Sequence, residues 1–232
     1  MCGRFTLRRI NLIRAAVDAV PLLPFEEFSE RPRFNVAPSQ MIPLVRLDKD
    51  GKRVLDIARW GLIPSWSKSL PKIRPINARA DTLATSPMFR KGFDSRRCLI
   101  PADGFYEWKA SPEKKAKQPY FIHYKDDRLF TFAGLWERWH SDEDDKVIET
   151  CTIITTKPNA VLEPIHNRMP VIIRPEDRQR WLDANTPGKA VSDLLEPTDP
   201  QEMEAYAISP AVNRPANDGP ELVKPKPPDE PA

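Results

Sequence analysis

The chain has 232 residues, of which 40% are hydrophobic, and its formal net charge at neutral pH is only +3. Six tryptophans and ten phenylalanines supply enough apolar surface for a folded core, and a chain of this length favours one domain over two. The small net charge excludes binding of nucleic acid through an overall positive field, so any nucleic-acid surface must be a local basic patch.

The apolar pattern of residues 11–20 predicts a short helix that ends at Pro21. Residues 41–47 and 53–60 flank a charged, glycine-containing turn and predict a hairpin. Part of 82–93 has a helical pattern. Strand-like runs and one helix follow. The predicted strands are 98–108, 119–125, 129–139, 147–156 and 169–175, and the predicted helix is 175–184.

Strands outnumber helices and neighbouring strands have short connections, so the predicted fold class is α+β with mostly antiparallel strands. The end of the chain is rich in proline and poor in large apolar side chains. We therefore expect one domain over residues 1–213 and a disordered tail over residues 214–232.

Cys2, Cys98 and Cys151 have no paired spacing and the three histidines are isolated, so neither a zinc site nor another cofactor is expected. This cysteine usage fits the reducing cytoplasm. The first apolar stretch is interrupted by Arg14 and Asp18, and no run reaches the length of a membrane span. We expect a monomer with no membrane contact.

Cys2 becomes the N-terminal residue if Met1 is removed, which the small side chain after Met1 favours. Its α-amine then has a pKa near 7.7–8.0, so roughly one amine in ten is neutral at pH 7. A neutral amine attacks an aldehyde to form a Schiff base, and the adjacent thiol can close on the imine carbon to give a stable thiazolidine. Alternatively, Cys2 has no chemical role and is simply the residue after the initiator Met1.

Four short segments each combine a side chain that can bind or react with neighbouring residues that are conformationally stiff. Arg4 offers a planar fork for phosphate, and Glu107 lies between two aromatic residues that should raise its pKa. Asn77 and His166 are the polar residues of the other two segments. Taken singly, each of these residues also has a structural explanation, as a salt-bridged strand residue, a turn residue or a loop histidine.

Six ordered motifs resemble those of the SRAP family, the SOS-response-associated peptidase-like proteins that process abasic sites. They are the N-terminal MCGR, FNVAPSQ (34–40), WGLIPSW (60–66), INARADT (76–82), PADGFYEW (101–108) and IHNRMP (165–170). The resemblance runs from residue 1 to about residue 213. It implies a compact α+β domain in which strands form a distorted barrel with peripheral helices. It also implies binding to single-stranded DNA and a covalent link between the terminal cysteine and the ring-opened aldehyde of an abasic site.

The resemblance also implies residue roles. Cys2 is the nucleophile, Asn77 positions the amine and the sugar, and Glu107 and His166 transfer protons. Further residues are expected to contact DNA: Arg4, Asn35, Trp66, Arg79, Met88, Thr155 and Arg168. Pro87 departs from the family pattern, in which a longer polar or basic side chain is expected at this position. The resemblance therefore does not decide whether Met88 and its neighbour contact DNA as in the family.

Three functions remain to be distinguished. The first is DNA repair through a covalent thiazolidine crosslink to abasic single-stranded DNA, with AP lyase activity permitted by the imine. Such a protein would associate with the nucleoid when bound to DNA. The second is a cysteine peptidase that uses Cys2 to remove its own Met1. The third is a non-covalent single-stranded DNA-binding module that uses arginine and tryptophan.

Overall fold

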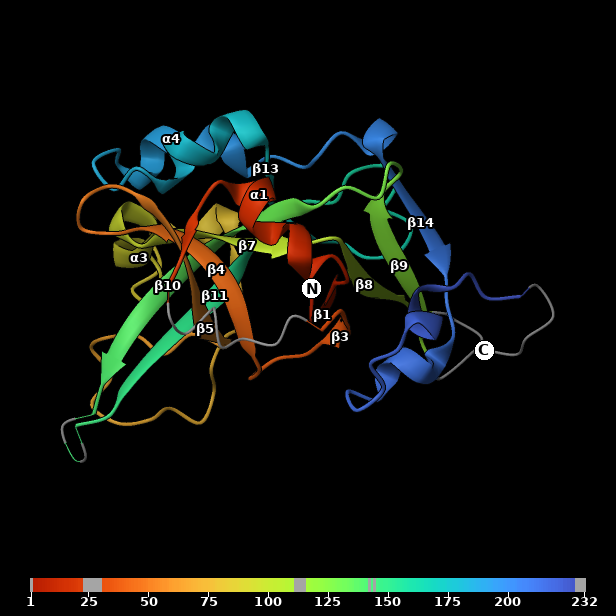
Figure 1. Ribbon diagram of the computed structural model, residues 1–232, viewed down its shortest axis with the longest axis horizontal. Helices are drawn as coiled ribbons and strands as arrows, with labels where there is room; N and C mark the ends of the chain where they lie inside the picture. The colour runs from red at the N-terminus through yellow and green to blue at the C-terminus, as the bar shows by residue number, and fades with distance from the viewer. Residues whose placement is uncertain (1, 23–30, 111–115, 142, 144, 228–232) are drawn as a thin grey trace.

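Five strands close into a barrel in the computed structural model, which describes residues 2–22, 31–110, 116–141, 143 and 145–227 (Figure 1). The barrel strands are β4 (Met41–Leu47), β5 (Arg53–Trp60), β7 (Arg97–Ala102), β10 (Phe130–His140) and β11 (Val147–Thr156). Their order is β11-β10-β7-β4-β5, with antiparallel neighbours. A parallel pairing of β11 with β5 closes the ring, because Thr150 lies opposite Arg59 and Cys151 opposite Trp60.

Four short strands extend the barrel sheet. They are β2 (Val20–Pro21) on β5, β6 (Asn77–Arg79) and β12 (Met169–Pro170) on β11, and β13 (Ile172–Ile173) on β10. β6 runs parallel to β11 and β12 runs antiparallel to it. The INARADT and IHNRMP motifs therefore both meet the C-terminal part of β11.

A second, antiparallel sheet packs against the barrel. Its order is β14 (Met203–Ala207), β9 (Gln118–Tyr124), β8 (Gly104–Lys109), β1 (Arg4–Leu7) and β3 (Arg33–Val36). Phe5 and Phe105 make edge-to-face contacts with Phe132 of β10, at centroid distances of 5.9 and 6.0 Å. These rings join the two sheets through one apolar core.

The helices are short and peripheral. In the described ranges the α-helices are α1 (Ile13–Val17), α3 (Arg90–Ser95) and α4 (Arg178–Leu182). The 3₁₀ helices are Ile10–Leu12, Ala80–Thr82, Pro175–Asp177, Gly188–Leu195, Pro200–Glu202, Pro210–Asn213 and Pro220–Val223. Buried Arg97 fastens α3 and α4 to the barrel, because its guanidinium donates to the carbonyl oxygens of Phe93 (2.6 Å) and Trp181 (2.5 Å).

The predicted α+β class and the barrel are confirmed, and the predicted hairpin is β4–β5. The helix expected over 11–20 ends earlier, since Asp18 adopts a left-handed conformation (φ 48°). The run 98–108 is two strands, β7 and β8, separated by Asp103. The strand expected over 169–175 is likewise divided, into β12 and β13.

Residues 214–227 are folded onto the second sheet, which corrects the expectation of a disordered tail that begins at residue 214. Leu222 is fully buried beside Tyr106 and Phe121. The Asp218 carboxylate accepts hydrogen bonds from the backbone N–H groups of Phe34 (2.5 Å) and Asn35 (2.8 Å). Few apolar side chains suffice here because the segment needs to cover only one edge of the sheet. Residues 228–232 lie outside the described residues.

Candidate functional site

The pairing of β1 with β8 brings Cys2 to Glu107. Arg4 lies opposite Tyr106 in this antiparallel pair, so the residues just before β1 lie beside those just after Tyr106. Cys2 is fully buried and the Glu107 side chain is almost so. Met1 lies outside the described residues, so the expectation that it is removed stays a prediction.

Burial sets the protonation of the Cys2–Glu107 pair. Burial raises the pKa of the Cys2 thiol, and the nearby Glu107 carboxylate raises it further. Burial likewise raises the pKa of Glu107 above its ordinary value. The thiol is therefore protonated at neutral pH, and the carboxylate beside it is a stronger base than a solvated glutamate.

Asn77 contributes a buried acceptor. β6 places it opposite Ile153 of β11, and its side-chain N–H lies 3.5 Å from the Ile153 carbonyl oxygen. Its Oδ1 is buried and has no hydrogen-bond partner among the described residues. A buried oxygen in this state suits a donor that arrives with a ligand, such as an amine or a sugar hydroxyl.

His166 is oriented by the backbone of Arg168. Its Nδ1 lies 3.1 Å from the Arg168 backbone nitrogen and 3.2 Å from the Arg168 carbonyl oxygen. Nδ1 therefore has a partner whether or not it carries a proton. Partial burial lowers the pKa of His166, so the ring is mostly neutral at pH 7.

Contacts of Trp60 hold the segment of Cys2 near that of Asn77. The ring of Phe5 contacts Trp60 at a centroid distance of 5.3 Å, and the Trp60 indole donates to the carbonyl of Ile76 (2.9 Å), directly before Asn77. The charge of Lys117 acts on both Glu107 and His166. It opposes the effect of burial on the pKa of Glu107 and adds to it for His166.

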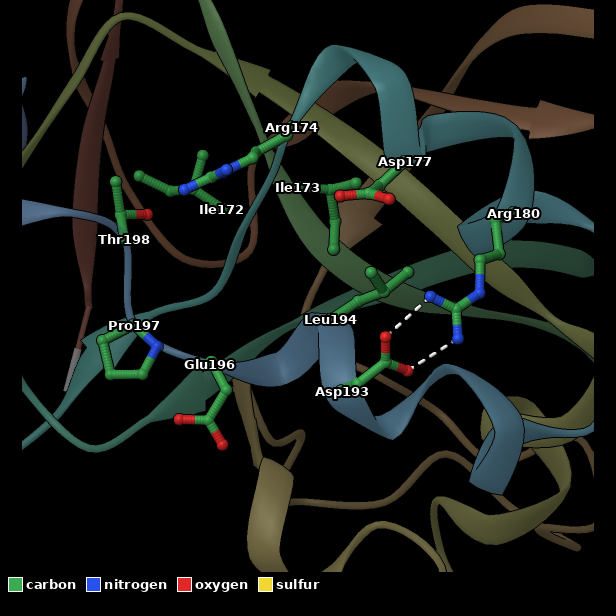
Figure 2. Close-up of a pocket in the computed structure, with 10 residues that line it drawn as sticks. All are labelled: Ile172, Ile173, Arg174, Asp177, Arg180, Asp193, Leu194, Glu196, Pro197 and Thr198. Carbon is green, nitrogen blue, oxygen red and sulfur yellow. Dashed lines mark hydrogen bonds and ion pairs between the residues drawn. The ribbon is translucent and has the colours of Figure 1, made fainter.

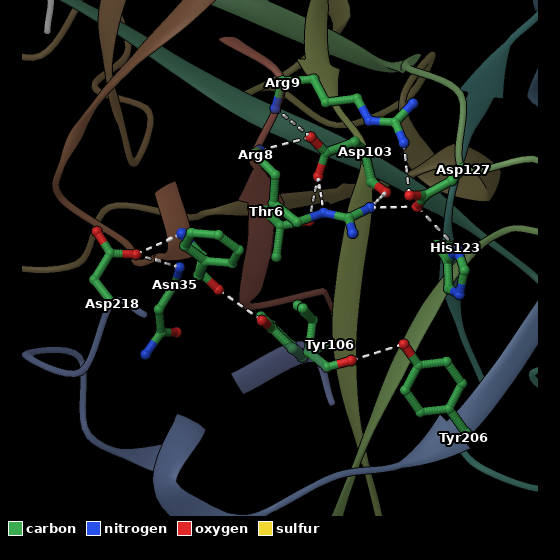
Figure 3. Close-up of polar contacts among 12 residues, drawn as sticks. Thr6, Arg8, Arg9, Asn35, Asp103, Tyr106, His123, Asp127, Tyr206 and Asp218 are labelled. Atoms are coloured by element: carbon green, nitrogen blue, oxygen red, sulfur yellow. Dashed lines mark hydrogen bonds and ion pairs between the residues drawn. The ribbon is translucent and has the colours of Figure 1, made fainter. Parts of the chain in front are cut away.

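A buried carboxylate fixes the start of the chain (Figure 3). Asp103 accepts hydrogen bonds from the Thr6 hydroxyl (2.6 Å) and from the backbone nitrogens of Arg8 (2.6 Å) and Arg9 (2.9 Å). The Arg8 guanidinium also pairs with Asp103 (3.0 Å) and with Asp127 (2.5 Å). These contacts hold β1 against β8, and so hold the segment that carries Cys2 beside Glu107.

Arg4 is held in place by neutral acceptors. Its Nη1 donates to Asn35 Oδ1 (2.8 Å) and to the Val212 carbonyl (2.9 Å). Asn35 is itself buried, and its Nδ2 donates to three backbone carbonyls. The polar atoms of the Asn35 side chain are therefore paired within the protein, and the expected contact of Asn35 with DNA stays a prediction.

Arg79 and Arg168 share one carboxylate. Asp81 accepts two hydrogen bonds from Arg79 (2.6 and 3.1 Å), and Arg168 Nη2 lies 3.6 Å from Asp81 Oδ1. Arg168 also donates to the Thr155 carbonyl (2.5 Å). The side chains of Arg79 and Asp81 are more than half exposed. We call this set the Arg79–Asp81–Arg168 cluster.

The remaining predicted DNA contacts have different surroundings. Trp66 is 60% exposed, whereas Met88 is half-buried and packs against the core. Thr155 is fully buried, and its hydroxyl lies 3.5 Å from the Ala78 carbonyl. This contact links β11 to β6, and the expected contact of Thr155 with DNA stays a prediction.

The surface also has a cavity of about 330 Å³ between α4 and the 3₁₀ helix Gly188–Leu195 (Figure 2). Arg180 and Asp193 form a two-point ion pair there (2.6 and 2.7 Å), and no predicted site residue lines it. Within the described residues, no set of three His, Cys, Asp or Glu side chains is arranged to hold a metal ion. None of the described helices is long and apolar enough to span a membrane.

A sequence model of the family described as SOS response associated peptidase (SRAP) matches residues 1–215. The chain belongs to the SRAP family. This confirms the resemblance drawn from the six motifs, and the match includes every predicted site residue.

Similar proteins and a similar crystal structure support the family assignment. The chain is 47% identical over 228 residues to the abasic site processing protein YoqW of Bacillus subtilis, covering 97% of this chain and 99% of that protein. It is 31% identical to the abasic site processing protein YedK of Escherichia coli, covering 97% and 100%. A crystal structure of a protein from Bacteroides thetaiotaomicron matches with a TM-score of 0.86 at 28% identity, covering 97% and 100%. The fold of the family is therefore shown for this chain.

Two residues of the site were not singled out from the sequence. Asp81 lies in the INARADT motif, and its spacing of two from Arg79 was the available signal. Lys117 precedes β9, and its position along the chain gives no hint that it acts on both Glu107 and His166.

Proposed function

We propose that this protein processes abasic sites in single-stranded DNA by forming a thiazolidine through Cys2. The observation that carries the proposal is the placement of Cys2 beside the buried Glu107 carboxyl, whose pKa burial raises. The names of the relatives, abasic site processing proteins, support the substrate. Removal of Met1 supplies the α-amine that the chemistry requires.

The aldehyde must first be exposed, because an abasic sugar is mostly a closed hemiacetal. Opening removes the proton of the anomeric hydroxyl and supplies a proton to the ring oxygen. Glu107 is the proposed group for this exchange, since a carboxyl with a raised pKa can both accept and return a proton near neutral pH.

The amine of Cys2 then attacks the aldehyde carbon. The attacking nitrogen gives up a proton as the carbinolamine forms, and the hydroxyl later leaves as water with a proton added to it. Neutral His166 can accept the first proton at Nε2 and supply the second, while Arg168 holds Nδ1. The unpaired Oδ1 of Asn77 can accept a hydrogen bond from the amine and orient its lone pair.

Ring closure joins the sulfur to the carbon of the protonated imine. The thiol loses its proton to Glu107, and the electron pair of the C=N bond returns to nitrogen. Because burial keeps the thiol protonated, closure depends on this neighbouring base. The imine also permits β-elimination at the sugar, so some strand cleavage accompanies the crosslink when closure is slow.

Arg4, Arg79 and Arg168 are the proposed phosphate contacts on this DNA. The acceptors of Arg4 are an amide and backbone carbonyls, so its charge remains to attract a phosphate. Three such contacts predict a modest slope of log affinity against log salt, about −2 for a single strand.

The test is a denaturing gel of the protein with an abasic oligonucleotide, followed by mass analysis of the shifted band. We expect a band that survives heating, with the mass of protein without Met1 plus DNA minus one water. Binding seen only in native gels would overturn the covalent proposal and leave a binding module. A stable crosslink formed by protein that retains Met1 would overturn the aminothiol mechanism.

A further inference from the structure

A small hollow with positively charged walls lies beside the cavity of Figure 2. Its volume is about 60 Å³, and its lining includes Tyr124, Arg128, Arg174, Arg178 and Thr198. It shares Ile172, Ile173, Arg174 and Thr198 with the cavity of about 330 Å³, so the two spaces adjoin. We call the smaller space the Arg178 hollow and the larger one the adjoining cavity. No residue predicted for the Cys2 site lines either of them.

Several elements build the walls of the Arg178 hollow. Arg174 directly follows β13, and the 3₁₀ helix Pro175–Asp177 leads from it into α4, whose first residue is Arg178. Tyr124, which ends β9, is buried. The side-chain amide of Asn159 donates to the Thr198 carbonyl (2.9 Å) and so holds the remaining wall. The chain therefore brings two arginines and a hydroxyl to one space.

Arg178 is a buried cation that forms no ion pair with any residue the structure describes. It is only 6% exposed, and its guanidinium donates to the Ala16 carbonyl. Its Nε is buried and has no hydrogen-bond partner among the described residues. Burial lowers the pKa of Arg178, and the like charge of Arg53 lowers it further, whereas Glu176 opposes both effects. A buried charge with an unpaired donor is costly unless a ligand supplies an acceptor, so the hollow suits an anion.

The charges around the hollow favour phosphate over a carboxylate. Among the described residues that line it, the one carboxylate is that of Glu202, which pairs with Arg128. Arg174 forms no ion pair in the described ranges, so two guanidinium groups, those of Arg174 and Arg178, are left for a ligand. Two positive charges match a phosphate dianion, and the guanidinium fork fits its oxygens. One water needs about 10–15 Å³ of such space, so the hollow has room for a group of four or five heavy atoms.

The adjoining cavity is polar, and most of its charges are already paired. Arg180 pairs with Asp193, and Glu196 pairs with Lys157 (2.9 Å). Asp177 also lines the cavity and forms no ion pair within the described residues. Walls of this kind suit an uncharged body with hydroxyl groups, since a carboxylate accepts their hydrogen bonds. A second phosphate would meet the charge of Asp177 and would be disfavoured.

We propose that the two spaces together bind a small polyol phosphate, with its phosphate in the Arg178 hollow and its hydroxylated body in the adjoining cavity. Arg178 contacts the phosphate from the buried side, and Arg174 contacts it from the exposed rim. A volume of about 330 Å³ is within the range of small-ligand sites. The proposal does not depend on the Cys2 chemistry, because the two sites share no residue and the ligand needs no aldehyde.

The experiment is isothermal titration calorimetry of the full chain at neutral pH and low salt. The ligands are glucitol 6-phosphate, glucitol 1,6-bisphosphate, glucitol and inorganic phosphate. None of them contains an aldehyde, so none can react with an N-terminal cysteine.

The test variants are Arg178→Gln and Arg174→Gln. Thermal unfolding shows whether Arg178→Gln, a change at a buried position, still folds. Arg174 is exposed, so its variant keeps the test decisive if Arg178→Gln does not fold. The control is Arg138→Gln, which removes one exposed guanidinium at the far end of β10 from Phe130, a residue that lines the hollow.

We expect glucitol 6-phosphate to bind the parent protein about tenfold more tightly than inorganic phosphate does, and glucitol to give no measurable binding. Each test variant should bind glucitol 6-phosphate about 10- to 100-fold more weakly, as expected for the loss of a charge-assisted hydrogen bond. The bisphosphate should bind more weakly than the monophosphate, because of Asp177. The control Arg138→Gln should bind as the parent protein does.

Failure of glucitol 6-phosphate to bind the parent protein would overturn the proposal, and so would unchanged binding in the test variants. An equal loss in Arg138→Gln would indicate a general electrostatic effect and overturn it as well. Equal affinities for glucitol 6-phosphate and inorganic phosphate would overturn the assignment of the adjoining cavity to a polyol. Displacement of the ligand by intact single-stranded DNA would show that the arginines belong to a nucleic-acid surface, which contradicts a separate small-molecule site.

Discussion

The two halves of the candidate site differ in their exposure to solvent. The Cys2–Glu107 pair is buried, and burial shifts the pKa of both groups. The Arg79–Asp81–Arg168 cluster lies at the surface, with the side chains of Arg79 and Asp81 more than half exposed. Water and salt screen the second half but barely reach the first.

This difference separates chemistry from binding. A buried carboxyl changes its proton affinity, which is what a proton-transfer step needs. An exposed ion pair adds little to stability, but its charges stay accessible to an arriving phosphate. Variants of the buried half should therefore change rates, and variants of the exposed half should change affinities.

The largest effect is expected for Cys2→Ala, which removes the nucleophilic sulfur. No heat-stable crosslink should form, while affinity for intact single-stranded DNA stays near that of the parent protein. A residue inserted before Cys2 should give the same result, because the α-amine then moves away from the thiol. Cys98→Ala is the matched control, since Cys98 is also fully buried but lies in β7 and has no assigned role. A stable crosslink formed by Cys2→Ala would contradict the assignment.

Glu107→Gln should slow crosslinking by about 10²–10⁴-fold, because it removes one proton-transfer group without changing shape. Since Glu107 acts as a base when ionised, the parent rate should fall as the pH drops through its raised pKa. The variant should lack this acid limb. Rates measured from pH 4 to 8 check both points. A variant with the parental pH profile would show that Glu107 does not titrate in the rate-limiting step.

The sequence predicted most of the fold because hydrophobic periodicity and turn residues are local signals. The β4–β5 hairpin has the predicted bounds for this reason. The closure of the barrel by β11 and β5 joins residues almost one hundred positions apart, and no local pattern encodes it. The folding of residues 214–227 onto the sheet was not predicted, because their proline content indicated disorder, whereas Leu222 and Asp218 dock the segment.

The candidate site residues were predicted from motifs, and motifs carry no information on burial. Asn35 and Thr155 lie in or beside motifs that surround the site, but their side chains point into the protein. A motif shows that a residue belongs to a site without showing which neighbour it contacts. Asp81 was overlooked for the same reason, because its place in the site follows from its proximity to Arg168, which lies far along the chain.

His166→Ala should slow crosslinking by about 10²-fold, less than the loss at Glu107, because solvent can partly replace a half-buried imidazole. The pKa of His166 is lowered, so the neutral base is present at pH 7 and is lost as the pH falls through that pKa. The variant should therefore lose the most rate near neutral pH. Added imidazole should restore part of the rate to the alanine variant, and it should not restore Glu107→Gln.

Asp81→Asn should have the smallest effect, and it should be a gain. In the free protein the Asp81 carboxylate accepts the hydrogen bonds from Arg79 that a phosphate would otherwise accept. The hydrogen bond from Arg79 also holds the pKa of Asp81 below its usual range, so the carboxylate is charged at neutral pH. Removing that charge should raise affinity for single-stranded DNA by about two- to five-fold. The salt slope should steepen by up to about 0.7, and the crosslinking rate at saturating DNA should not change.

The matched control is Asp193→Asn, which breaks a similarly exposed pair with Arg180 beside α4. Its DNA affinity should equal that of the parent protein. A loss of affinity in Asp81→Asn would mean that the carboxylate orients the two arginines for phosphate rather than competing with it. The arginines of the exposed half would then be held in a fixed orientation before DNA binds, as the groups of the buried half are. The gain is the expected result because an exposed arginine can turn toward a phosphate without help from a carboxylate.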